Sequence, residues 1–200
     1  GDADGGDLSD WNRLSHGGNS SSVKRYGDGQ VIDGVTISVN GSGSNNSGAS
    51  AFWPGTDMDP YYVKATDDLV YSTDSGLGIT GRSNELNITT TGLEADRLYT
   101  VRIYSLVNEA AETIDVAVTN GESTEFRRNL NRQTLFNTDP LSSDLIFESV
   151  APDANGQLII SLGSEDAVSA GAIVIEPNPA ESIAFTEVSE GDTALSSSGS

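Results

Sequence analysis

The sequence predicts an all-β protein built as an antiparallel β-sandwich. Three segments near its middle, 86–91, 98–105 and 114–119, alternate apolar and polar residues with the period of two that is typical of strands. The third segment ends at Asn120-Gly121, a dipeptide that tolerates the positive φ angles of a two-residue type I′ hairpin. We therefore expect a return strand over 122–127, and a sheet organised around these segments.

Length and composition favour a single domain. The 200 residues suffice for one sandwich with a substantial core, and the 22 glycines suit a protein with many tight turns. The expected organisation is an acidic and polar segment over 1–22, the sandwich over 23–177, and a linker rich in serine and acidic residues over 178–200. Linker-like sequence at both ends also predicts neighbouring modules in a longer chain.

The net charge of −20, from 30 acidic and 10 basic residues, argues against nucleic acid as a partner because phosphates would add like charge. No run of 18 apolar residues is present, so we expect no membrane insertion. The chain has no cysteine, which removes disulfides, thiolate metal sites and cysteine nucleophiles. These features suit a secreted or cell-surface bacterial protein, and the acidity suits a saline environment.

Further strands are expected on both sides of the central segments. The pattern indicates strands at 23–26, at 31–39 with an interruption at Asp33-Gly34, and at 67–71, 144–150, 157–162 and 172–175. The residues expected to face the core are Leu86, Ile88, Tyr99, Val101, Ile103, Val116, Ile146, Leu158, Ile160 and Val174.

Acidic residues crowd the first ten positions. Asp2, Asp4, Asp7 and Asp10 lie among glycines, and closely spaced carboxylate oxygens are what calcium requires. The run resembles, in degraded form, the thrombospondin type 3 repeats that link bacterial surface modules. Calcium is therefore a possible structural cofactor, with Asp57 and Asp59 as a second place for it, and the alternative is a solvated acidic linker.

Aromatic residues cluster after the Gly-, Ser- and Asn-rich loop 40–50. Phe52, Trp53, Tyr61 and Tyr62 lie in loop sequence together with Asp57 and Asp59. Aromatic faces stack on the apolar faces of sugar rings, and carboxylates bond their hydroxyls, so Trp53, Tyr61 and Tyr62 are candidate ligand contacts. The alternative is that Phe52 and Trp53 plug the end of the sandwich.

A basic island lies at 126–137. Arg127 and Arg128 are a reserve site for a carboxylated or sulfated ligand, because arginine bonds such groups in a bidentate manner. The alternative is that these arginines pair with carboxylates of the chain itself. The single histidine, His16, lies in a polar loop that is a poor place to hold catalytic geometry.

Several turns and strands together resemble a bacterial family of secreted galactose-binding-like jelly-roll modules, related to malectin-like and carbohydrate-binding modules. The resemblance spans Val31 to Pro177. The matching positions are Leu93, Tyr99, Asn137, Pro152, Asp153, Asn155 and Gly156. These matches mark the fold and identify no ligand. The resemblance implies a non-catalytic module that binds a polysaccharide or glycan through its loops, with Asn137 as a further hydroxyl partner.

Two other function classes remain open. An enzyme lacks support because the sequence has no Gly-x-Ser-x-Gly elbow, no phosphate-binding glycine loop and no His-Glu-x-x-His motif, although a carboxylate pair could hydrolyse glycosides. We expect no catalytic residues. A structural or adhesive spacer in a larger surface protein is the main alternative, and the discriminating feature is whether Trp53, Tyr61 and Tyr62 line an open groove or are buried.

Overall fold

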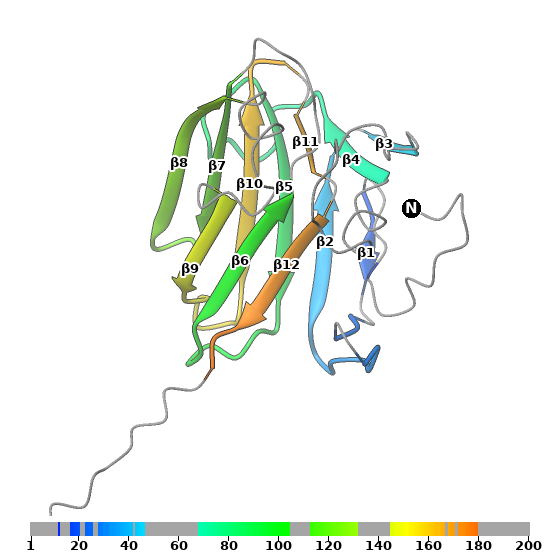
Figure 1. Cartoon of the computed structure of the whole chain (residues 1–200), viewed down its shortest axis with the longest axis vertical. Helices are drawn as coiled ribbons and strands as arrows, with labels where there is room; N and C mark the ends of the chain where they lie inside the picture. Colours follow the sequence, from blue (N-terminus) through cyan, green and yellow to red (C-terminus); the bar gives the residue numbers. More distant parts are fainter. Residues whose placement is uncertain are drawn as a thin grey trace, which may run out of the picture.

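The chain forms an antiparallel β-sandwich, which confirms the predicted fold class (Figure 1). The computed structural model describes residues 12, 17–20, 23–25, 28–41, 43–46, 68–104, 113–131, 145–166, 168–170 and 172–179. Within these residues every regular element is a strand. Successive strands cross between sheets, as in a jelly roll, so that neighbours in sequence often lie in opposite layers.

The strands form three sheets. A six-stranded sheet has the order β1-β2-β5-β10-β7-β8, and two three-stranded sheets have the orders β12-β6-β9 and β11-β4-β3. The strands are β1 (Asn19–Ser20), β2 (Thr36–Asn40), β3 (Gly43–Asn46), β4 (Asp68–Ser72), β5 (Asn84–Thr91), β6 (Tyr99–Tyr104), β7 (Thr113–Thr119), β8 (Thr124–Asn131), β9 (Ile146–Val150), β10 (Leu158–Ser164), β11 (Val168–Ala170) and β12 (Ala172–Pro177). The first of these strands, β1, precedes Val23 in the sequence.

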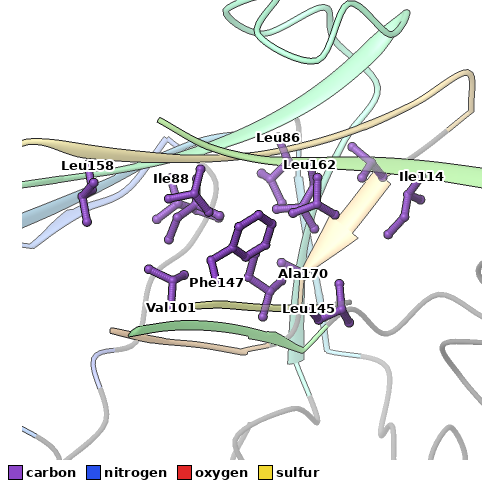
Figure 2. Packing of buried hydrophobic residues seen from close by; sticks show 14 of the residues in the cluster. Leu86, Ile88, Val101, Ile114, Leu145, Phe147, Leu158, Leu162 and Ala170 are labelled. Carbon is purple, nitrogen blue, oxygen red and sulfur yellow. The ribbon is translucent and has the colours of Figure 1, made fainter. Parts of the chain in front are cut away.

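The core lies between the six-stranded sheet and the sheet β12-β6-β9 (Figure 2). Phe147 on β9 points from the smaller sheet toward Leu86 and Leu162 on the larger one, and all three side chains are fully buried. Burial of this apolar surface is the main stabilising contribution to the fold. The predicted inward positions on β5, β6, β7 and β10 are confirmed, namely Leu86, Ile88, Tyr99, Val101, Ile103, Val116, Leu158 and Ile160.

The predicted inward residues of β9 and β12 were wrong. Ile146 and Val174 both pair with Arg102, and paired residues share a face of the sheet, so both lie on the outer face. Val174 is nevertheless buried. Apolar residues stand on both faces of β9 and β12, so period two alone could not decide which set faces the core.

The predicted two-residue hairpin at Asn120-Gly121 is also wrong. Thr119 pairs with Thr124, so the loop contains the four residues between them. The carboxamide oxygen of Asn120 accepts bonds from the backbone amides of Glu122 and Ser123, at 3.0 and 2.8 Å. Gly121 takes a φ of +88°, whereas Asn120 stays outside the positive region that a type I′ turn requires.

The sandwich has two distinct ends, which we name by a residue at each (Figure 1). At the Arg82 end of the six-stranded sheet, β5 and β7 begin and β8 and β10 end. In the sheet β12-β6-β9, β6 ends at this end, and β9 and β12 begin there. The described loop residues there are 73–83 and 165–166. At the Gly156 end the connections are 92–98, 120–123 and 151–157.

The turns that carried the family resemblance meet at the Gly156 end. The Leu93 amide donates to the Gly156 carbonyl at 3.0 Å, and Gly156 has a φ of +73°. A Cβ at Gly156 would overlap the backbone of Leu93, so only glycine allows the two turns to approach this closely. The Tyr99 hydroxyl accepts a bond from the Glu94 amide at 3.0 Å and fixes the first turn to β6.

Candidate functional site

The predicted ligand contacts fall on both described and undescribed parts of the chain. Arg127 and Arg128 lie on β8 and are described. The other candidate residues lie outside the described residues. They are Trp53, Asp57, Asp59, Tyr61, Tyr62, Asn137, His16 and the predicted calcium ligands Asp2, Asp4, Asp7 and Asp10. Their roles stay predictions.

The strands that flank the aromatic segment are described, and they are paired. β3 and β4 run antiparallel, with Asn46 opposite Asp68. The segment 47–67 therefore begins and ends at adjacent positions of two neighbouring strands in the sheet β11-β4-β3 (Figure 1). The aromatic residues are carried by a connection between two neighbouring strands, which is where binding residues are often found on a rigid scaffold.

The two predicted arginines lie on opposite faces of β8. Arg127 pairs with Val116, an inward residue, and its guanidinium lies 4.8 Å from the centre of the Phe147 ring. Its Nη2 is 2.6 Å from Oε1 of Glu125. Arg128 points to the outer face and stacks on the Phe126 ring at 4.1 Å. The two guanidinium groups are therefore not placed to bind one anion together.

A bulge in β8 surrounds the buried carboxylate of Asp115. The register shifts between Ile114 and Val116, so that Arg128 and Asn129 together face Asp115, and Asn129 has a φ of +54°. The Asn129 amide donates to Asp115 Oδ1 at 2.7 Å, and Arg128 Nη1 donates to Oδ2 at 3.0 Å. The bulge thus aims two donors of β8 at one carboxylate of β7.

Arg82 is the second cation on Asp115. Its Nε and Nη2 donate to the two carboxylate oxygens at 3.0 and 2.9 Å, in a bidentate arrangement. These bonds raise the pKa of Arg82 above its ordinary value. Burial tends to raise the pKa of Asp115, but the bonds from Arg82, Asn129 and Arg128 outweigh it and hold that pKa below its ordinary range. The carboxylate is ionised and its lone pairs are committed to the chain itself.

Glu85 is a second buried carboxylate on the same outer face, and its side chain accepts bonds from the loop 73–83. The Thr80 amide donates to Oε1 at 2.5 Å and the Ile79 amide to Oε2 at 3.1 Å. Burial opposes ionisation, but these backbone bonds, above all the one from the Thr80 amide, outweigh it and lower the pKa of Glu85. The loop therefore covers the outer face of β5 and β10 because a carboxylate holds its backbone there.

Gly163 explains how the loop 73–83 comes so close. It pairs with Glu85 on one side and with Asp115 on the other, so it separates the two buried carboxylates. A Cβ on Gly163 would overlap the side chain of Thr80. The missing side chain leaves the space that Thr80 fills.

These contacts support the second interpretation of the basic island. Arg127 is paired with Glu125, and Arg128 with Asp115, so both arginines neutralise carboxylates of the same chain. Sequence reasoning singled out neither Arg82, Asp115 nor Glu85. The nearest signal was an acidic residue, Asp115, at a polar position of one strand, with two consecutive arginines in the next strand.

Within the described ranges, no group of three or more His, Cys, Asp or Glu side chains is placed to hold a metal ion. The same part of the chain contains no helix long and apolar enough to cross a membrane.

Comparisons with known proteins add little to this geometry. No family model matches the chain, and no curated protein matches it. Among solved structures, it is similar to one titled "CpGH89CBM32-6 produced by Clostridium perfringens", with 14% identity and a TM-score of 0.31, covering 73% of this chain and 95% of that one. At that TM-score the likeness carries no argument about function, so a function has to be argued from the chain's own residues.

Proposed function

We propose that this chain is a non-catalytic module that binds polysaccharide or glycan, in a secreted or cell-surface bacterial protein. The observation that carries the proposal is the pairing of Asn46 with Asp68, which fixes both ends of the aromatic-bearing segment 47–67 to two paired strands. A ligand platform needs such a scaffold, because the sugar-binding side chains must be held in place before the sugar arrives.

The chemistry of the segment suits sugars. Trp53 is the first choice as a stacking platform, with Tyr61 and Tyr62 beside it in sequence. Asp57, Asp59 and Asn137 supply the hydrogen-bonding groups that a sugar's hydroxyls require.

A neutral glycan fits better than an anionic one. Arg127 and Arg128 face opposite sides of β8, and each is paired with its own carboxylate. An anionic ligand would have to displace Glu125 or Asp115, and a net charge of −20 would oppose its approach.

The buried carboxylates of the described residues support a non-catalytic role. A glycosidase needs one carboxylic acid with a raised pKa beside one free carboxylate. The pKa values of Glu85 and Asp115 are both lowered, and both carboxylates accept bonds from their own chain. Neither has the properties of a general acid.

The test is affinity electrophoresis of the whole chain through gels that contain neutral polysaccharides, such as galactomannan and xylan, or anionic ones, such as alginate. We expect a neutral polysaccharide to retard the chain. Trp53→Ala should reduce the retardation, because losing the stacking and burial of one aromatic ring weakens the binding free energy by about 1–3 kcal/mol. The matched control is Trp11→Ala, which removes the other tryptophan and should leave retardation unchanged.

Thermal melting of both variants separates binding from folding. If Trp53→Ala unfolds the domain and no polysaccharide retards the parent chain, Trp53 is a core plug. The spacer function then replaces the binding function.

A further inference from the structure

We propose that Arg82 is a positioning residue, whose guanidinium fixes the loops of the Arg82 end relative to one another. The consequence for binding rests on the proposed function, because Asn137 lies in the segment that leaves β8 at this end. Arg82 itself is placed away from any ligand role, since its donors are committed to Asp115, Asn129 and Glu165.

The Arg82 side chain reaches three separate parts of the fold. Nε and Nη2 hold Asp115 on β7, as described above. Nη2 also donates to Oδ1 of Asn129 at 2.8 Å, inside the β8 bulge. Nη1 reaches Oε1 of Glu165, in the turn between β10 and β11, at 3.4 Å. Arg82 belongs to a fourth part, the loop that leads into β5.

Neighbouring side chains add further bonds between the parts of the fold that Arg82 joins. The Ser83 hydroxyl donates to Glu165 Oε2 at 2.6 Å, and the Asn84 carboxamide donates to the carbonyls of Glu165 and Asp166, each at 3.0 Å. Arg128 Nη1 also donates to the Thr80 carbonyl at 3.2 Å. The loops 73–83 and 165–167 and the β8 bulge are therefore joined through side chains.

The β8 bulge lies shortly before the end of that strand. The segment 132–144 follows the bulge directly, because β8 ends at Asn131. The bulge geometry depends on Asn129, whose positive φ is unfavourable for a non-glycine residue. Bonds from its amide to Asp115 and from Arg82 to its side chain stabilise that conformation. Arg82 thereby stabilises the bulge that lies just before the last residues of β8, and Asn137 follows β8 in the sequence.

Only arginine can make these contacts together. The guanidinium is planar and presents five donors in fixed directions, whereas the ammonium of lysine is one compact charge. Arg82→Lys keeps the positive charge beside Asp115 but loses the simultaneous reach to Asn129 and Glu165. Arg82→Lys therefore no longer holds Asn129 and Glu165 in place, but it still neutralises most of the negative charge of Asp115.

Amide hydrogen exchange tests the coupling without any ligand. In Arg82→Lys we expect exchange at Thr80, Asn129 and Asp166 to accelerate by about tenfold, as local opening becomes easier. Exchange at Leu93 and Gly156, at the opposite end, should stay unchanged. The matched control is Arg102→Lys, which alters an ion pair with Glu176 on the other sheet and should not affect the Arg82 end.

A binding measurement then tests the consequence. On a polysaccharide gel that retards the parent chain, Arg82→Lys should lose about threefold to tenfold in affinity, while Arg102→Lys should lose none. Unchanged exchange at the Arg82 end would overturn the positioning role, and so would faster exchange with undiminished affinity. If the exchange responds but no polysaccharide retards the parent chain, the positioning role holds and the glycan-binding function fails.

Discussion

The two ends of the sandwich are held together in different ways. At the Gly156 end, short turns are fixed mainly by bonds within each turn and by the close approach of Gly156 to Leu93. At the Arg82 end, Arg82 bonds to partners that are 33, 47 and 83 positions away in sequence. Turn bonds and a close backbone approach thus hold one end, and ionic contacts hold the other.

At the Gly156 end, one turn is closed by its own residues. Asp153 Oδ1 accepts bonds from the amides of Asn155 and Gln157 at 2.9 and 2.6 Å, without help from another strand. Asn178 fixes the exit from β12 through longer-range bonds. Its amide donates to the Leu98 carbonyl at 2.8 Å, and its side-chain oxygen accepts from the Thr100 hydroxyl, 78 positions away, at 2.7 Å. None of these bonds joins two charged groups.

The largest expected effect comes from breaking the Arg82 end at its buried anion. Asp115→Ala removes the shared partner of Arg82 and Arg128 and leaves the Asn129 amide without its acceptor. We expect a loss of about 4 kcal/mol in the free energy of unfolding, as for other buried pairs from which one partner is removed. Urea denaturation followed by tryptophan fluorescence measures it.

The control for Asp115→Ala is Glu125→Ala, which removes the partly exposed partner of Arg127. That loss should stay below about 1 kcal/mol. Equal losses in the two variants would mean that the buried Asp115 carboxylate contributes no more to the free energy of unfolding than an exposed one.

The next effect tests the Gly156 end. Gly156→Ala places a Cβ against the Leu93 backbone at a φ of +73°, and we expect it to cost about 3 kcal/mol. Gly121→Ala is the matched control, because Gly121 also has a positive φ but its added Cβ would meet open space, so the cost should be about 1 kcal/mol. Equilibrium denaturation of both variants decides whether the close turn contact stabilises the fold.

A smaller effect should appear in acid. The folded state holds the pKa values of Glu85 and Asp115 below their ordinary values of 4.5 and 3.8, so the unfolded chain binds protons first as the pH falls. Their contribution is complete above the ordinary values and is lost as the pH falls through the lowered ones. Denaturation midpoints measured from about pH 6 to about pH 3 should decline, and Glu85→Gln should decline less steeply over that range. A parallel decline would show that Glu85 does not contribute.

The smallest expected effect comes from calcium. If Asp2, Asp4, Asp7 and Asp10 bind the ion, millimolar calcium should stabilise the chain by about 1 kcal/mol relative to chelator, because a ligand that binds only the folded state raises its stability. Differential scanning calorimetry measures the shift. A variant that lacks residues 1–10 should lose it, whereas a shift that survives the deletion would point to Asp57 and Asp59 instead.

The comparison of the two ends also explains how far the sequence could predict the structure. Strands with one apolar face were predicted correctly, as was the Asp33-Gly34 interruption, because their signals are local. Ile146 and Val174 were misassigned because their strands are apolar on both faces. The Asn120 loop was misassigned because its side chain, rather than a type I′ backbone, closes it.

The Arg82 end could not be predicted from the sequence. Nothing in the sequence shows that the loop just before β5 will fold back over the Glu85 carboxylate, and nothing near Arg82 indicates that Asp115 is its partner. Such contacts follow from strand order, which brings β5, β10 and β7 together in space. The aromatic contacts and the calcium ligands remain predictions, since they lie outside the described residues.

The most direct test of the claim that ionic contacts hold the Arg82 end is a double-mutant cycle. Unfolding free energies of the parent chain, Arg82→Ala, Asp115→Ala and the double variant give the coupling between the two side chains. We predict a coupling of about 2 kcal/mol that changes little between about 0.1 and 1 M NaCl, because the Asp115 side chain is only 3% exposed and salt screens buried pairs weakly. A coupling below about 0.5 kcal/mol, or one that vanishes in high salt, would contradict the claim.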